Sequence, residues 1–208
     1  MNPSSPDIIQ AAPTISLRQA SAADAAALAA LAHRVFHDTF AAQNDPHDMA
    51  LYLAASFGES LQRAEIEHPQ MQTFLAEAHV GDESPRLIGY AQLHRSEPPP
   101  CVIDRSAIEI KRFYIDHHWH GRGVATRLME TTCAFAAAPA FAHAGRQTSS
   151  KSPSPESGWS AKTIWLGVWE HNPRAIAFYR KCGFTHVGAH EFLFGNDLQS
   201  DWVMVKSL

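Results

Sequence analysis

The pattern of apolar and polar residues predicts a series of short strands and amphipathic helices from residue 14 onward. Strands are expected where β-branched and aromatic residues alternate with polar ones or run together, and helices where apolar residues recur every three or four positions. The expected strands are residues 14–18, 71–78, 86–95, 108–115, 163–169, 185–192 and 202–205. The expected helices are an Ala-rich segment from Ser21, residues 45–67, a segment from Val124, and residues 174–182. This order predicts one α/β (α+β) domain, with helices on both faces of a mixed sheet.

Two segments lack the pattern of a folded element. Residues 1–13 are rich in Pro, Ser and Ala and are expected to be disordered. Residues 145–160 read GRQTSSKSPSPESGWS, a polar, low-complexity composition that cannot bury enough apolar surface to order itself. We therefore expect one domain over residues 14–208, with residues 145–160 as a flexible insertion within it.

Composition excludes several classes of protein. The chain has 208 residues, 45% hydrophobic and 18% charged, which suits a globular protein of one domain. Its formal net charge is −4, so the basic surface typical of nucleic-acid-binding proteins is not expected. No apolar run reaches membrane-spanning length, and the first residues lack the pattern of a signal peptide. Together with three widely spaced cysteines, these features predict a cytoplasmic protein with reduced thiols that binds neither nucleic acid nor membrane.

A loop with two glycines joins the expected strand 108–115 to the helix that begins at Val124. Gly121 and Gly123 allow the main chain to approach a ligand closely, and the first free N–H groups of the helix point to the same place. Such a helix start binds anions, phosphates above all. A tight turn without a ligand is the alternative. The Rossmann fingerprint is excluded because Thr126 stands where it requires Gly or Ala, and the Walker pattern is absent.

Another helix start is marked by Asn172 and Pro173, which suit the N-cap and the first turn of a helix. Gly183 suits the left-handed residue that ends such a helix. Tyr179 lies seven residues, or two helical turns, after Asn172, so both side chains can face one ligand. The alternatives are a core tyrosine and an asparagine whose sole role is the cap.

Two of these stretches resemble motifs of the GCN5-related N-acetyltransferases (GNAT). IEIKRFYIDHHWHGRGVATRLM is similar to motif A, in which a strand leads to [Gln/Arg]-x-x-Gly-x-[Gly/Ala]; here His120 stands where Gln or Arg is usual. VWEHNPRAIAFYRKCGF resembles motif B. The tail HEFLFGNDLQSDWVMVKSL, with HDTF near residue 38, resembles the PaiA-like polyamine acetyltransferase branch. The resemblance covers roughly residues 14–208 apart from the insertion.

The resemblance implies acetyl-CoA as acetyl donor, no metal, and a mostly antiparallel sheet with one splayed pair of parallel strands. The loop 120–126 suits the pyrophosphate of coenzyme A, and the pantetheine amides suit an unpaired strand edge. Residues 113–115 supply this edge if they diverge from strand 163–169, a divergence that the resemblance implies. The expected cofactor-binding residues are Phe113, Tyr114, Ile115, His120, Gly121, Arg122, Gly123, Val124, Ala125, Thr126, Asn172 and Tyr179.

Acetyl transfer to an amine requires two proton transfers. The departing thiolate benefits from a proton donor, for which Tyr179 is the candidate. The acceptor ammonium, with a pKa near ~10, must lose a proton before it can attack. Glu109, a carboxylate within an apolar strand, is the candidate base, because a cleft would raise its pKa.

An ion pair with Lys111 or Arg112 is the alternative role of Glu109. Strand alternation places Glu109, Lys111, Phe113 and Ile115 on one face, and a bulge would change that assignment.

Thirteen histidines raise the question of a metal site. His117, His118 and His120 cluster, but no cysteine or carboxylate stands at zinc-ligand spacing from them. His33 and His37 share one helix face, where solvated or substrate-facing histidines are the favoured interpretation. We expect no metal, since the reaction needs none.

These observations predict an N-acetyltransferase that transfers an acetyl group from acetyl-CoA to a primary amine by direct attack in a ternary complex. The tail and the net charge of −4 suggest a small polyamine as acceptor, its remote ammonium groups held by Asp38, Asp45, Asp48 and Asp197. Two alternatives stay open: acetylation of a protein or peptide at its N-terminus or a lysine, and a non-catalytic acyl-CoA sensor. The sequence is compatible with a homodimer and leaves the oligomeric state open.

Overall fold

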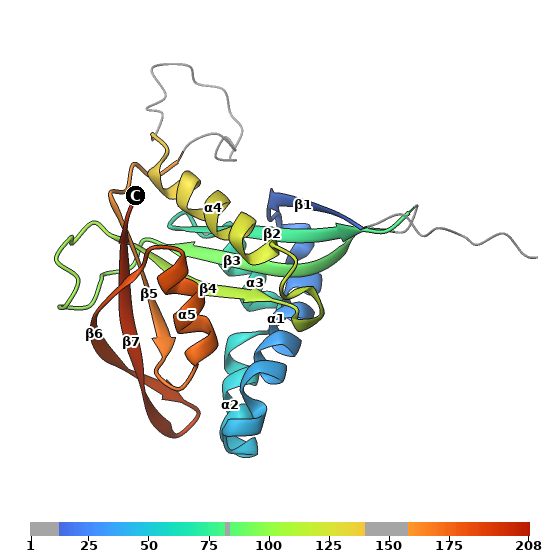
Figure 1. Cartoon of the computed structure of the whole chain (residues 1–208). Helices are drawn as coiled ribbons and strands as arrows, with labels where there is room; N and C mark the ends of the chain where they lie inside the picture. Colours follow the sequence, from blue (N-terminus) through green and yellow to red (C-terminus); the bar gives the residue numbers. More distant parts are fainter. Residues whose placement is uncertain (1–12, 82–83, 140–157) are drawn as a thin grey trace, which may run out of the picture.

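The computed structural model describes residues 13–81, 84–139 and 158–208 (Figure 1). Residues 1–12 of the expected N-terminal segment and residues 145–157 of the expected insertion lie outside the described residues. The strands are β1 (Thr14–Gln19), β2 (Met71–His79), β3 (Arg86–His94), β4 (Ile108–Ile115), β5 (Thr163–Trp169), β6 (Thr185–Phe194) and β7 (Asp197–Ser207). The α-helices are α1 (Ala25–Phe40), α2 (Pro46–Ser56), α3 (Glu59–Glu67), α4 (Val124–Ala137) and α5 (Pro173–Lys181). None of these helices has the length and apolar character needed to cross a membrane.

The seven strands form one sheet in the order β1-β2-β3-β4-β5-β7-β6. Every neighbouring pair is antiparallel except β4 and β5, which are parallel. The α/β class and the mostly antiparallel sheet are therefore confirmed.

β4 and β5 pair only at their first residues. Ile108 lies opposite Ile164 and Glu109 lies opposite Trp165, and no further pair follows along either strand. On its other side β4 remains paired with β3 up to Ile115. The last residues of β4 therefore present main-chain groups that β5 does not bond, which is the splay that the sequence resemblance implies.

Helices cover both faces of the sheet (Figure 1). One core cluster joins the sheet to α4 and α5 and contains Leu93, Ile110, Leu128, Met129, Ile164, Ile176 and Phe184. A second cluster joins the sheet to α1 and α2 and contains Leu28, Val35, Phe36, Met49, Leu53, Leu75 and Tyr90. Because the second cluster reaches β6 through Phe194, α2 also bounds the space between the diverging strands.

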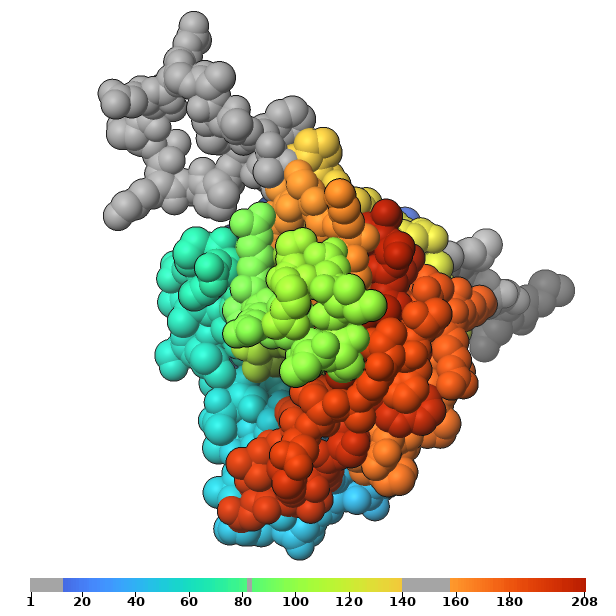
Figure 2. Space-filling model, turned by 90° about the vertical axis from the view of Figure 1, so that its left-hand side faces the viewer, coloured from blue at the N-terminus to red at the C-terminus, as the bar shows by residue number. Residues whose placement is uncertain are grey.

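The end of the sheet at β5, β7 and β6 is covered by the loop between β3 and β4, shown in green beside the red strands in Figure 2. Val102 and Ala107 of this loop pack with Trp165 and Val203. The same segment places Cys101 so close to Gly188 that a Cβ there would lie 2.7 Å from the Cys101 Cβ.

The helix expected over residues 45–67 is two helices, and this part of the prediction is wrong. α2 begins as expected, with the Asp45 carboxylate accepting hydrogen bonds from the N–H groups of His47 and Asp48. It ends at Phe57, whose buried ring occupies the second core cluster, and Gly58 adopts an extended conformation before α3. The break turns a polar face of α3 toward the sheet.

That polar face carries Glu65, which two consecutive residues of β4 neutralise. Lys111 Nζ donates to Glu65 Oε1 at 2.8 Å, and the Arg112 guanidinium donates to Oε2. Burial alone would raise the pKa of Glu65, but the charge of Arg112 and the hydrogen bond from Lys111 outweigh it and hold the pKa below its usual value. A register shift opposite Gln92 makes this possible, because it places Lys111 and Arg112 on the same side of β4.

We predict that Glu65→Gln destabilises the fold by about 3–5 kcal/mol, because it leaves the buried Arg112 guanidinium without its counter-charge. The free energy of unfolding in urea measures this. The control is Glu59→Gln, which breaks an exposed pair with Arg63 at 3.2 Å and should cost less than about 1 kcal/mol. Equal unfolding free energies for the two variants would contradict the role given to Glu65.

Candidate active site

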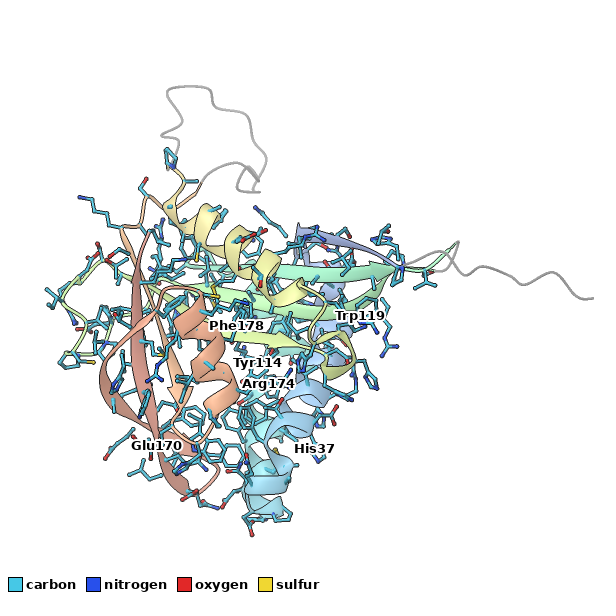
Figure 3. All side chains as sticks on the ribbon, in the orientation of Figure 1. His37, Tyr114, Trp119, Glu170, Arg174 and Phe178 are labelled. Carbon is cyan, nitrogen blue, oxygen red and sulfur yellow. The ribbon has the colours of Figure 1, made fainter. Side chains whose placement is uncertain are left out.

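A cavity of about 860 Å³ lies where β4 and β5 diverge. It is lined by residues of α1, α2, β4, β5, α5, β6 and β7, by the first turn of α4, and by the loop before α4. Figure 3 shows Tyr114, Arg174 and Phe178 around the space between β4 and α5, with Trp119 beside the loop before α4. The cavity therefore lies at the splay that the family resemblance implies.

The glycine loop (residues 120–126) forms one end of the cavity. Gly121 and Gly123 have φ angles of +75° and +77°, which L side chains rarely adopt, and Gly123 is the N-cap of α4. A Cβ added at either glycine would meet no atom within 4 Å, so the main chain faces open space. The first main-chain bond into α4 goes from Arg127 N to Gly123 O. The N–H groups of residues 124–126 therefore have no acceptor within the helix and are available to an anion.

His120 contributes differently from the Gln or Arg usual at its position. Its Nε2 donates to the Ile115 carbonyl at 2.9 Å. Burial and the charge of Arg174 lower its pKa, so the ring is neutral at neutral pH. His120 thus fastens the glycine loop to the end of β4, and the loop's capacity for anions comes from its main chain.

Of the expected cofactor-binding residues, eleven line the cavity and Arg122 does not. The Arg122 guanidinium lies 5.1 Å from the centre of the Trp119 ring, outside the lining. Asn172 lines the cavity and also caps α5, since its Oδ1 accepts a hydrogen bond from Ala175 N at 3.1 Å.

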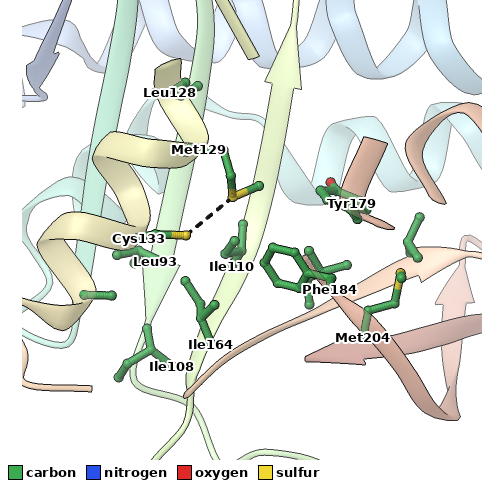
Figure 4. Packing of buried hydrophobic residues seen from close by; sticks show 14 of the residues in the cluster. Leu93, Ile108, Ile110, Leu128, Met129, Cys133, Ile164, Tyr179, Phe184 and Met204 are labelled. Carbon is green, nitrogen blue, oxygen red and sulfur yellow. Dashed lines mark hydrogen bonds between the residues drawn. The ribbon is translucent and has the colours of Figure 1, made fainter. Parts of the chain in front are cut away.

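Tyr179 is buried between α5 and β4, as Figure 4 shows in the core around Ile110 and Phe184. Its ring packs edge-on against Phe113, with centroids 6.3 Å apart, and both residues line the cavity. Its hydroxyl has no hydrogen-bond partner among the described residues. Burial raises the pKa of Tyr179 well above its usual value, so the hydroxyl keeps its proton at neutral pH and can donate it.

Glu109 is not brought into the cavity, so the structure does not place the expected base beside Tyr179. The Ser96 hydroxyl donates to Glu109 Oε2 at 2.7 Å, and His94 Nδ1 lies 3.3 Å from the same oxygen. The expected ion pair with Lys111 or Arg112 does not form either, because both residues bind Glu65. The bulge is the physical reason: Phe113 packs in the core cluster of α5, and Lys111 turns to α3.

Asp201 of β7 is the cavity carboxylate that the sequence did not reveal. It lies opposite Trp169 of β5 and His190 of β6. Burial, with a smaller effect from the charge of Glu170, raises its pKa to about 6. Gly167, inside an otherwise bulky strand, was the one available signal, since such a glycine marks a close approach. A Cβ on Gly167 would lie 3.2 Å from Asp201 Oδ2 and 2.7 Å from His190 Nε2.

Aromatic side chains form the part of the cavity between α1, α2 and the β5–β7 end of the sheet. We call this set the aromatic wall. Tyr52 is its centre, with ring centroids 4.7 Å from Phe36, 5.2 Å from Phe194 and 5.5 Å from Phe192. The members of the aromatic wall are Phe36, Phe40, Tyr52, Trp169, Phe192 and Phe194.

Of the four carboxylates expected to hold a polyamine, Asp38 alone lines the cavity. Asp45 caps α2, and Asp48 accepts hydrogen bonds from the main chain and side chain of Asn196. Asp197 accepts from Gln199 at 2.9 Å. Asp45, Asp48 and Asp197 therefore do not line the cavity.

The histidine cluster lies beside the cavity mouth. Ligand atoms of Asp116, His117 and His118 all lie within 4.8 Å of one another. The Asp116 carboxylate is already occupied: Arg34 donates to it at 2.7 Å, and His118 Nδ1 lies 2.9 Å away. Burial alone would raise the pKa of Asp116, but these contacts hold it well below its usual value. His33 and His37 do not join this cluster.

Comparison with known proteins assigns the chain to a family. The family model of the "Acetyltransferase (GNAT) domain" matches residues 70–186. A protein of Lactobacillus delbrueckii subsp. lactis, described as an uncharacterised N-acetyltransferase, is 31% identical over 195 residues, which are 93% of this chain and 98% of that protein.

Three solved structures share the fold at low sequence identity. The PaiA N-acetyltransferase of Thermoplasma acidophilum, in complex with coenzyme A, has a TM-score of 0.63 at 16% identity and covers 94% of this chain and 99% of that one. The structure of Arabidopsis thaliana NAA60 in complex with a bisubstrate analogue has a TM-score of 0.64 at 15% sequence identity. The match covers 94% of this chain and 99% of that one. A chimera of the spermidine N-acetyltransferase SpeG from Vibrio cholerae and hSSAT has a TM-score of 0.57 at 18% sequence identity. The match covers 93% of this chain and 95% of that one.

Proposed function

This chain belongs to the GNAT family and is an acetyl-CoA-dependent N-acetyltransferase, and we propose that it acetylates a primary amine by direct attack within a ternary complex. The observation that carries the proposal is that one cavity holds an open glycine loop, an unpaired strand edge and a buried, protonated tyrosine. These features fit, in that order, the phosphates, the amide arm and the leaving sulfur of acetyl-CoA.

The fit of coenzyme A rests on main-chain groups. The free N–H groups at the start of α4 suit the negative charge of a pyrophosphate, and the open space over Gly121 and Gly123 admits it closely. The pantetheine amides can pair with the edge that residues 113–115 turn toward the splay, as a peptide strand adds to a sheet. A structural neighbour of 16% identity was solved in complex with coenzyme A, which supports coenzyme A as the ligand.

We predict that Gly123→Ala weakens coenzyme A binding by about 10- to 100-fold, the loss of one hydrogen bond to a charged group, because the methyl group enters the space over the loop. Isothermal titration calorimetry measures the affinity. Gly81→Ala is the matched control: Gly81 also has a left-handed φ, +55°, with open space around it, but it lies outside the cavity lining. Both variants should lose about 1–2 kcal/mol of stability, and Gly123→Ala alone should lose affinity. Unchanged affinity in folded Gly123→Ala would contradict the proposed cofactor site.

Tyr179 is the proposed general acid. The thioester carbonyl carbon gains a bond to the amine nitrogen and then loses its bond to sulfur, and the departing thiolate accepts the Tyr179 proton. Its position beside Phe113 at the splay supports this role, because both residues line the cavity that would hold the thioester.

We expect Tyr179→Phe to lower kcat by ~10²–10⁴ with little change in the KM for acetyl-CoA, since only the hydroxyl is lost. Steady-state kinetics with a thiol-reactive dye measures this. Tyr90→Phe serves as the control, because the Tyr90 hydroxyl is buried without a partner and the residue does not line the cavity. A wild-type kcat in Tyr179→Phe, with chemistry shown to limit the rate, would assign the acid to water or to another residue.

A polyamine is one candidate acceptor, supported by the resemblance of the tail to PaiA-like enzymes and by a spermidine acetyltransferase among the structural neighbours. Against it, one of the four expected carboxylates lines the cavity. A protein or peptide amine, at an N-terminus or a lysine, is the second candidate. Free-thiol release from acetyl-CoA, measured across polyamines, simple amines and peptides, tests all of them. Coenzyme A binding without release on any acceptor would favour a sensor instead.

A further inference from the structure

We propose that Asp201 binds the ammonium group of the acceptor and removes its proton, in a subsite whose aromatic wall selects a primary amine with an apolar body. The inference rests on the proposed amine acetylation and adds its base and its substrate class.

The surroundings of Asp201 call for a cationic ligand. The residue is half-buried, yet no group in the described part of the chain donates a hydrogen bond to its carboxylate, and no lysine or arginine there pairs with it. Removing a carboxylate even partly from water without a partner is costly. Because Asp201 lines the cavity, a ligand that enters can supply the missing positive charge.

The neighbouring titratable groups leave this charge uncompensated. Glu170, beside β5, repels it. His190 lies next to it, but burial lowers the His190 pKa, so the ring is neutral at neutral pH. Tyr52 of α2 lies across the cavity; burial raises its pKa, and the charge of Asp201 adds to that effect. Gly167 leaves room for both the carboxylate and the imidazole, which a larger residue would displace.

The part of the aromatic wall around Asp201 indicates which chemical group is attached to the amine of the substrate. Tyr52, Trp169 and Phe192 bound the space that a substrate held by Asp201 must fill. Aromatic faces attract an ammonium group and bury apolar groups attached to it. Asp38, the one other aspartate of the lining, is much more exposed, at the rim near His117. The other lining residues of this subsite are aromatic rings and the neutral side chains Asn44 and Gln199, which offer a second ammonium group no carboxylate, so arylalkylamines and alkylamines fit better than polyamines.

The proton balance follows from these positions. The acceptor ammonium gives one proton to Asp201, and the freed lone pair forms the N–C bond. The second N–H proton leaves as the tetrahedral intermediate collapses and replaces the proton that Tyr179 gave to the thiolate. The products are the amide, coenzyme A thiol and protonated Asp201, which returns its proton to solvent.

This mechanism predicts a specific pH dependence. The active form has an ionised Asp201 and a protonated amine, so kcat/KM rises as pH passes through the Asp201 pKa of about 6 and falls above the amine pKa near ~10. Asp201→Asn can use only free amine from solution. Its kcat/KM should therefore be lower by ~10²–10⁴ at pH 7 and should climb continuously toward pH ~10 without a limb near 6.

The experiment measures these profiles with phenethylamine for wild type, Asp201→Asn and Glu191→Gln. Glu191 is an exposed carboxylate on β6, next to His190, and its removal changes the net charge equally without touching the cavity. Coenzyme A affinity, measured by calorimetry, should stay unchanged in all three proteins and reports an intact fold. If Asp201→Asn keeps the wild-type kcat/KM and its kcat/KM still rises through pH 6, Asp201 is not the base.

Two further measurements separate this inference from the proposed function. Phenethylamine, hexylamine and spermidine are compared as acceptors, and preference for spermidine would overturn the apolar substrate class. Binding of phenethylamine to the coenzyme A complex is measured by calorimetry, and Asp201→Asn should lose at least about tenfold in affinity. If no amine is acetylated but this loss is observed, the amine-binding site stands and the proposed reaction fails. Equal binding by both proteins would refute the site whatever the turnover.

Discussion

The cavity depends on the early end of pairing between β4 and β5. Two residue pairs join the strands, and beyond Glu109 and Trp165 they diverge. Main-chain N–H and C=O groups that leave a sheet must find other partners, and those of the last β4 residues face a space lined by α5 and the glycine loop. The same divergence therefore opens the site and supplies groups that an amide-containing ligand can use. Had the strands stayed paired, Tyr179 would have been an ordinary core residue.

The diverging half of β4 needs an anchor of its own, and Glu65 provides it. Lys111 and Arg112 bind this carboxylate on the face of the sheet that α3 covers. Phe113 and Ile115 pack in the core on the opposite face. Two consecutive residues can serve one partner only because of the bulge opposite Gln92. The bulge thus replaces β5 as the constraint on this segment.

Local signals account for most of what the sequence predicts correctly. Asn172 at a helix cap, Gly183 with its φ of +91°, and the two glycines before α4 each act within a few residues, so spacing alone identifies them. The break before α3 was missed because the buried ring of Phe57 outweighs the helical periodicity around it. The surroundings of Glu109 could not be foreseen for a similar reason, since its neighbours Lys111 and Arg112 bind a glutamate more than forty residues away in the chain. Asp201 could not be recognised from its own segment, because its surroundings come from β5, β6 and α2.

Burial raises the pKa values of both Tyr179 and Asp201, with opposite consequences for their use. The tyrosine would be protonated at neutral pH without any shift, and the higher pKa makes its hydroxyl a weaker acid, so its proposed use rests on its position in the cavity. For the aspartate, the shift to about 6 brings a normally weak base closer to the working pH while leaving it ionised there. The two groups belong to opposite faces of the sheet: Tyr179 packs with Met204 on the α5 side, whereas Asp201 alternates away from it with Val203. An intact sheet would keep the proposed acid and base apart. The splay is the opening through which one substrate could reach both, so the same geometry that offers the proposed cofactor site also brings the proposed acid and base to a single cavity.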